Sequence, residues 1–261
     1  MTTPTIHVSV VSHGQCGITA QLLQDIQNHC RDMSLQVTVT LNIPETLCFD
    51  PDRFGFSVHL LRNIQPQGFS ANHNAAFHHA RQNYPCRYFC VVNPDIRFSS
   101  NPFSELLDCL KDSRVGVVAP LVLNAQGEVE DSARRFPTPL GILAKALGKA
   151  HRSDYAIDRS TAAPDWVAGM FMLIPVETYH RIGGFDERYF LYYEDVDLCA
   201  RLRLAGYNVR LCPAAQVVHE ARRQSHREWR YLKWHVTSAL RFFTSKAFIG
   251  VTWRRLTGTG A

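Results

Sequence analysis

Short apolar runs rich in β-branched residues alternate with segments of helical periodicity through the first part of the chain. Such runs predict strands at residues 6–12, 37–42, 57–63 and 88–95. Helical spacing predicts helices at residues 19–31 and 71–83, the second with Ser70 as a cap. This alternation is typical of an α/β protein whose mainly parallel sheet has helices on both faces.

The pattern loosens beyond residue 95. We expect a helix at 102–111, a strand at 115–123, a loop or hairpin at 124–139 and a single strand at 166–175. Residues 140–164 hold a short helical piece and a polar stretch that ends in proline, which predicts a flexible substrate loop. A further helix begins near Glu194 and stops at Gly206.

Composition favours one domain, or one domain with an appendage. The chain has 261 residues, of which 46% are hydrophobic and 20% are charged, enough to bury a large core. The net charge of +5 comes from the tail, because the sequence beyond Glu220 contains nine Lys and Arg but only one acid, Glu228. No run approaches the about 18 apolar residues that span a bilayer, and no signal peptide is recognisable.

Eight cysteines occur without any CxxC pair, and several lie in apolar runs. This usage predicts reduced, buried thiols rather than a disulfide framework or a zinc site. We therefore expect a cytoplasmic protein.

Polar residues stand where the predicted strands end, which is where open α/β sheets bind ligands. These residues are Ser12, His13, Asn42, Asn63, Asn93 and Asp95. Pro94 turns the backbone so that the Asp95 carboxylate projects at the sheet edge, where it is suited to a hard divalent cation. The alternative is a turn that only ends the strand.

Three acids, Glu194, Asp195 and Asp197, crowd the start of a predicted helix behind a run of aromatic residues. The helix dipole accounts for one acid there, but neighbouring carboxylates repel each other and raise each other's pKa. A carboxylate on a rigid, partly shielded helix end is suited to act as a general base.

Four further side chains are candidates, each with a structural alternative. His219 ends an apolar run and is suited to a cation or a phosphate, and Arg134 and Arg135 are suited to a phosphate or an anionic acceptor. Asn74 lies near a helix start and is the candidate for a donor contact. His73, His78 and His79 form no ligand pattern and are interpreted as packing or surface residues.

Together these segments resemble the inverting glycosyltransferases of family 2, which have the GT-A fold. The similarity covers about residues 6–220 and is carried by VSVVSHG, NIQPQGFSANHNAAF, VVNPDI, the long block from Trp166 to Tyr207, and VVHE. The ARRFPTP segment is similar to bacterial rhamnosyltransferase-like members that build surface polysaccharides.

The resemblance implies a role for each matched position. Asp95 stands at the metal-binding aspartate, with Asn93 replacing the first acid of the motif, and Asp195 stands at the catalytic base. His219 matches a histidine near the metal and diphosphate, where Mg²⁺ or Mn²⁺ binds. Trp166, Gly169 and Glu194 fall on the acceptor side. After the second strand the chain departs from the family's DNxS pattern and reads LNIPETL, so Asn42 and Glu45 are the candidates for contact with the nucleotide base, whose identity the departure leaves open.

The resemblance also implies the domains and partners. Residues 1–220 form the catalytic domain, which binds the nucleotide sugar with about the first 100 residues and the acceptor with the rest. The first candidate for the donor is dTDP-rhamnose, and UDP-sugars are the second. The expected acceptor is a glycan or a lipid-linked saccharide.

Residues 221–261 form a basic tail that is rich in aromatic residues. Such a helix suits the headgroup region of an anionic membrane, on the inner face of the cytoplasmic membrane. The alternatives are packing on the catalytic domain and an oligomer contact. The rival function is a non-catalytic module that binds sugar nucleotides, membranes or nucleic acid through the tail, although no nucleic-acid recognition motif occurs.

Overall fold

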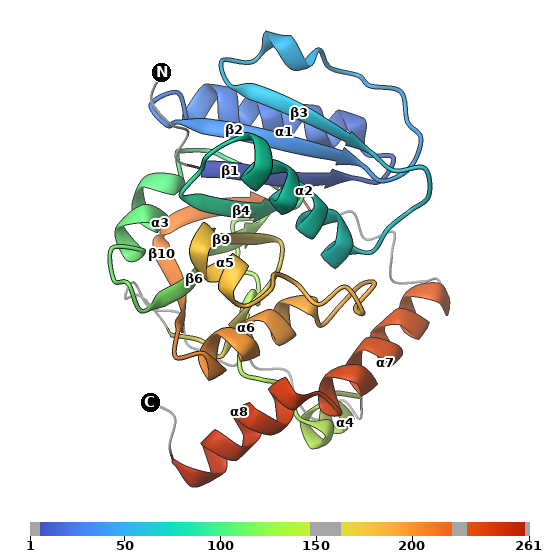
Figure 1. Cartoon of the computed structure of the whole chain (residues 1–261), viewed down its shortest axis with the longest axis vertical. Coiled ribbons are helices and arrows are strands. Elements are labelled where there is room, and N and C mark those ends of the chain that lie inside the picture. Colours follow the sequence, from blue (N-terminus) through green and yellow to red (C-terminus); the bar gives the residue numbers. More distant parts are fainter. Residues whose placement is uncertain (1–5, 147–162, 221–228, 259–261) are drawn as a thin grey trace.

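The computed structural model describes residues 6–146, 163–220 and 229–258, and its centre is an eight-stranded sheet (Figure 1). Its strands, in spatial order, are β3 (Ser57–Arg62), β2 (Leu35–Leu41), β1 (Ile6–Ser12), β4 (Tyr88–Val92), β9 (Phe171–Pro175), β6 (Val115–Asn124), β10 (Asn208–His219) and β5 (Ile96–Arg97). Only β9 and β5 pair antiparallel to their neighbours. The predicted mixed, mainly parallel sheet is confirmed.

Helices cover both faces of this sheet, because successive strand residues point to opposite sides. In β4, Cys90 and Val92 pack with Leu22 of α1 (Cys16–His29), whereas Phe89 and Val91 pack with Phe77 of α2 (Phe69–Asn83). The remaining helices of the domain are η1 (Pro51–Arg53), α3 (Phe103–Cys109), α4 (Pro139–Ala146), α5 (Val176–Arg181) and α6 (Glu194–Leu204). The carboxyl ends of β1, β2, β3 and β4 meet at one edge.

Two local predictions are wrong. The strand expected at 166–175 divides at Gly169 into β8 (Trp166–Val167), which pairs with β7 (Ala133–Arg134), and β9. Ser70 does not cap α2: Gly68 holds that position, and Ser70 is buried inside the first turn. Most of the expected flexible loop, residues 147–162, lies outside the described residues.

The prediction that all cysteines are reduced thiols is wrong for one pair. Cys16, at the start of α1, is disulfide-bonded to Cys48 in the loop after β2, while the other six cysteines are free. The two partners are 32 residues apart in sequence, so neither a CxxC pattern nor any other local spacing announces the bond.

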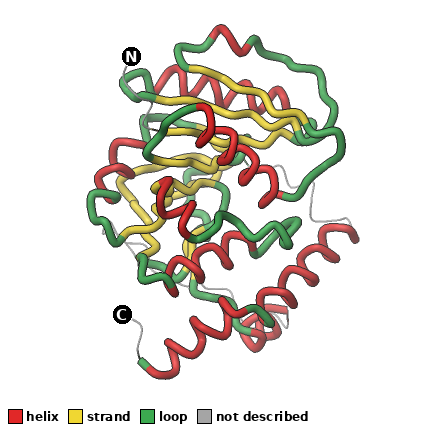
Figure 2. The backbone as a smooth tube through the Cα atoms, in the orientation of Figure 1, coloured by secondary structure: helices red, strands yellow, loops and turns green. Residues whose placement is uncertain are grey.

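The C-terminal tail forms two helices, α7 (Trp229–Phe243) and α8 (Lys246–Thr257), along one side of the molecule (Figure 2). Phe242 is fully buried, and the Ser238 hydroxyl donates to the Leu191 carbonyl at 2.9 Å. The Arg254 guanidinium donates to the Arg203 and Leu204 carbonyls at the end of α6. One side of the tail therefore packs on the domain, and in the described part of the chain no helix is long and apolar enough to cross a membrane.

Candidate functional site

Asp95 lies at the sheet edge beside His219. The two come together because β10 pairs antiparallel with β5, which aligns His219 with Ile96. His219 Nε2 is 3.3 Å from Asp95 Oδ2, while its Nδ1 is 2.8 Å from Glu130 Oε2. Asp95 Oδ1 is buried and has no hydrogen-bond partner.

Electrostatics favour a positive charge between these acids. Burial opposes protonation of the imidazole, but hydrogen bonds and attraction from Asp95 and Glu130 outweigh it and raise the pKa of His219 to about 9. A cation that displaced this proton would meet the same two acids. Glu130 was missed by sequence reasoning, because it lies in a polar stretch with no motif of its own.

The crowded acids lie at the start of α6, as predicted. Asp195 accepts hydrogen bonds from the backbone N–H groups of Gly169 at 2.9 Å and Val196 at 2.8 Å. Burial raises the pKa of Asp195, and these N–H groups and the charge of Arg134 oppose the rise. Burial and the repulsion of Asp195 raise the pKa of Glu194 well above its usual range.

Gly169 and its neighbour connect the two groups of acids. A side chain at Gly169 would lie 3.3 Å from the Phe69 ring and 3.5 Å from Asp195 Cβ, so the glycine allows the close backbone contact. The next residue, Met170, accepts a hydrogen bond from the Asn93 N–H at 2.9 Å. Consecutive residues therefore touch the Asp195 carboxylate and the turn that carries Asp95.

The antiparallel pair of β7 and β8 adds an arginine and an aromatic ring to the same region. The Arg134 guanidinium lies 5.5 Å above the Trp166 ring and is bound to Asp131, while the Trp166 indole N–H donates to the Arg135 carbonyl. The positive charge of Arg134 on β7 acts against the rise that burial causes in the pKa of Asp195, so this strand brings a cation within electrostatic reach of the acid pair. Arg135 is exposed at the edge.

Most of the predicted donor residues gather at the ends of β1, β2 and β3. The Asn42 amide oxygen accepts from Asn63 Nδ2 at 2.8 Å, and its nitrogen lies 3.2 Å from His13 Nδ1. Glu45 Oε2 accepts from the Cys16 N–H at 3.0 Å, while its Oε1 is buried without a partner. Ser12 is fully buried, and its hydroxyl accepts from the Gln15 N–H.

Asn74, the residue predicted to contact the donor, lies apart from this group. Its side chain is buried and makes four hydrogen bonds within the protein. The amide nitrogen donates to the Phe185 carbonyl and to Glu187, and the amide oxygen accepts from the Tyr179 hydroxyl and the Phe185 N–H. Asn74 therefore fixes the segment that leads to the acid pair.

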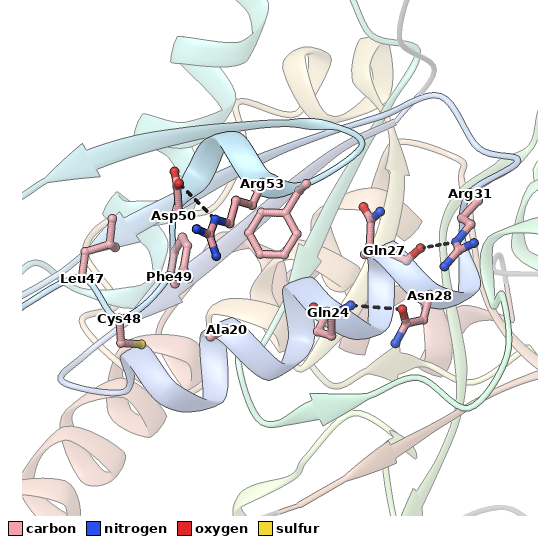
Figure 3. A pocket seen from close by; sticks show the side chains of 11 residues that line it. Ala20, Gln24, Gln27, Asn28, Arg31, Leu47, Cys48, Phe49, Asp50 and Arg53 are labelled. Atoms are coloured by element: carbon pink, nitrogen blue, oxygen red, sulfur yellow. Dashed lines mark hydrogen bonds and ion pairs between the residues drawn. The ribbon is translucent and has the colours of Figure 1, made fainter.

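A separate groove of about 670 Å³ lies along the outer side of α1, away from the acid pair (Figure 3). Arg31 and Gln24 line it from the helix, and Phe49 and Arg53 line it from the loop after β2. In the described residues, no cluster of three or more His, Cys, Asp or Glu side chains is arranged to hold a metal ion. Asp95 and His219 are therefore a neighbouring pair and not part of such a cluster.

Comparisons with known proteins support a glycosyltransferase with the GT-A fold. Residues 155–226 match the family model described as the N-terminal domain of galactosyltransferase. The solved structure of GalNAc-T7 with UDP, GalNAc and Mn²⁺ superposes with a TM-score of 0.67 over 93% of this chain and 49% of that chain, at 14% identity. The mannosyltransferase PcManGT of Pyrobaculum calidifontis, solved with GDP-Man and Mn²⁺, gives 0.60 over 92% and 65%, at 17% identity.

Curated relatives narrow the resemblance to rhamnosyltransferases. The chain is 27% identical to Rhamnosyltransferase WbbL of Escherichia coli over 190 residues, 70% of this chain and 72% of the relative. It is 33% identical to the N-acetylglucosaminyl-diphospho-decaprenol L-rhamnosyltransferase of Mycobacterium tuberculosis over 149 residues, 53% of this chain and 48% of the relative. The predicted resemblance to rhamnosyltransferase-like enzymes is confirmed, although the chain spans only about half of the mycobacterial relative.

Proposed function

We propose that this chain is a metal-dependent inverting glycosyltransferase, in which residues 1–220 are the catalytic domain. It transfers a sugar from a nucleotide diphosphate to a hydroxyl of a glycan or lipid-linked acceptor, and the first candidate is L-rhamnose from dTDP-rhamnose. One observation carries the proposal: the half-buried Asp195 carboxylate is fixed by two backbone N–H groups at the head of a helix. UDP-sugars are the next donor candidates.

Asp195 is the base in this scheme. Of the two neighbouring acids, Glu194 is the more buried, and both burial and repulsion favour its protonated form. Asp195 keeps N–H donors and the charge of Arg134 beside it, so it is the carboxylate that accepts a proton from the acceptor hydroxyl. That oxygen attacks the anomeric carbon from the face opposite the nucleotide, the bond between this carbon and the diphosphate oxygen breaks, the nucleoside diphosphate leaves, and the configuration inverts.

Asp95 and His219 are suited to hold a divalent cation. The unpartnered Asp95 Oδ1 and the adjacent imidazole provide two neighbouring ligand groups, and an oxygen and a nitrogen ligand suit Mn²⁺, with Mg²⁺ as the alternative. When bound, the ion would neutralise the diphosphate that leaves the sugar. Asn93 lacks a carboxylate, so donor phosphates are left to complete the coordination.

The names of the relatives support the sugar and the acceptor class. Two of them are rhamnosyltransferases, and the name of the mycobacterial enzyme specifies a diphospho-decaprenol substrate. The strand-end cluster around Asn42, with Glu45 beside it, takes the nucleotide. Trp166 offers an aromatic face to an acceptor sugar, next to Gly169 and Arg134.

The test follows turnover and donor binding separately. Asp195→Asn should lower the transfer rate from dTDP-rhamnose by about 10²–10⁴-fold while keeping donor-induced thermal stabilisation. Asp95→Ala should lose the metal-dependent part of that stabilisation, and the exposed Asp108→Asn on α3 is the control. A product with retained configuration, or an Asp195→Asn variant as fast as the wild type, contradicts the mechanism. Stabilisation without any turnover supports a non-catalytic binding module.

A further inference from the structure

The tail helices have two apolar sides, and only one of them packs on the domain. Ser238 and Phe242 of α7 and Ala247 of α8 are buried against it. The other side carries large exposed side chains at spacings of three and four residues, which place them along one face of each helix. We call this face the outer apolar stripe: Trp229, Leu232, Val236 and Leu240 of α7, and Ile249, Trp253 and Leu256 of α8.

The stripe is too large and too regular for scattered surface hydrophobics. Trp229 is 85% exposed and Leu256 is 79% exposed, and they lie near opposite ends of the helix pair. Elsewhere in the described residues, the exposed large hydrophobics are Ile64, Val129, Leu140 and Phe190. Exposed apolar residues gathered along the faces of two neighbouring helices mark a surface that binds a partner or a membrane.

Charge identifies the partner. From Trp229 to the end of the chain the sequence holds six Lys and Arg and no Asp or Glu. Arg230, Lys233 and Arg241 lie on the flank of α7 beside the stripe, and Lys246 and Arg255 are exposed on α8. Tryptophan, leucine and basic residues on one amphipathic helix are typical of helices that lie in a lipid headgroup region.

We propose that α7 and α8 dock the protein on an anionic phospholipid surface through the outer apolar stripe. Its apolar side chains enter the headgroup boundary, and the basic flank contacts lipid phosphates. A contact between two copies of this face would bring the five exposed basic residues of each copy together, which disfavours a dimer through the same surface.

The docking face also connects to the site. The Trp234 ring stacks on Phe190 at 4.7 Å, and the Arg241 guanidinium lies 6.0 Å from the Tyr189 ring. Both partners belong to the segment directly before Glu194, which is the acceptor side of the site. Docking would hold that side close to the surface where a lipid-linked acceptor lies. This last step rests on the proposed function, whereas the docking itself does not.

Vesicle binding by the full chain tests the proposal. Purified protein should sediment with vesicles of phosphatidylcholine and phosphatidylglycerol, less so at high salt, and weakly with phosphatidylcholine alone. The Leu232→Glu, Leu240→Glu double variant should bind at least about tenfold more weakly, because two leucines no longer enter the apolar boundary. Ile64→Glu, Val129→Glu changes two exposed hydrophobics elsewhere by the same charge and should bind like the wild type.

Ile249→Glu, Leu256→Glu on α8 gives an independent variant if the first one unfolds. The proposal is overturned if the wild type ignores anionic vesicles, or if both stripe variants bind like the control. A dimer that the stripe variants dissociate, without vesicle binding, would assign the face to a second copy instead. Without vesicles, the stripe variants and the control variant should hydrolyse the donor at the same slow rate. If none of them hydrolyses it, the proposed transferase function is contradicted, but the docking proposal is not.

Discussion

Replacing Asn74 by alanine should destabilise the protein out of proportion to the size of the change. The side chain connects α2 to the turn at Gly184 and Phe185. Without the Asn74 amide, the Phe185 carbonyl loses its side-chain donor and the Tyr179 hydroxyl loses its acceptor. The Phe185 N–H keeps a contact to the Tyr179 oxygen at 3.3 Å. Glu187 is exposed and can bind water instead.

Two newly unsatisfied buried groups set the magnitude. Each costs about 1–3 kcal/mol, so the free energy of unfolding should fall by about 3 kcal/mol. Urea unfolding followed by tryptophan fluorescence measures this loss. The control is Asn83→Ala, which removes an exposed amide near the end of the same helix and should cost less than about 0.5 kcal/mol.

A double-mutant cycle separates the contact from the helix. Tyr179→Phe should cost about 1 kcal/mol alone, and much less in the Asn74→Ala background, because its partner is already gone. If Asn74→Ala and Asn83→Ala unfold at the same urea concentration, or the two costs simply add, then the four hydrogen bonds do not hold the turn as argued.

Three further outcomes are expected. Gly68→Ala should destabilise α2 or displace the 185–193 segment, because its Cβ would lie 2.7 Å from the Phe190 oxygen, and thermal unfolding would detect either effect. Burial lowers the pKa of His73 to about 3, so stability is complete above pH 6.5 and falls as pH drops from 6.5 towards 3; His73→Gln should reduce that acid slope by up to about 1.4 kcal/mol per pH unit. Cys48→Ser should cost about 2–4 kcal/mol under oxidising conditions, and added reductant should destabilise only the wild type.

The elements that the sequence predicts best are those with a local signal. β1, β3 and β6 lie within a residue of their expected ends, because each is a β-branched run bounded by polar residues. The sheet order was not predictable, since it depends on pairings between distant segments. The break at Gly169 lies in an apolar run without a polar residue or proline, so the sequence showed one strand where two exist.

The same difference separates the site residues. Asp95 follows an apolar run that predicts the end of a strand, and the acids of α6 stand where the helical spacing begins, which predicts the start of a helix. Glu130 has no local signal and reaches His219 only through the chain fold, at 2.8 Å. Asn74 has the right residue type and helix position for a ligand contact, but only the fold shows that its four hydrogen bonds are already made.

The backbone directly before the acid pair is held in an unfavourable conformation. Tyr192 and Tyr193 have φ values of 70° and 67°, in the left-handed region that costs a residue with a side chain about 1–3 kcal/mol. Such a turn persists only where its surroundings fix it, and here α2 bonds to Phe190 while α7 bonds to Leu191. The position of Asp195 therefore depends on contacts from both α2 and α7. Loosening α7 should disturb the acid pair even though no residue of α7 belongs to it.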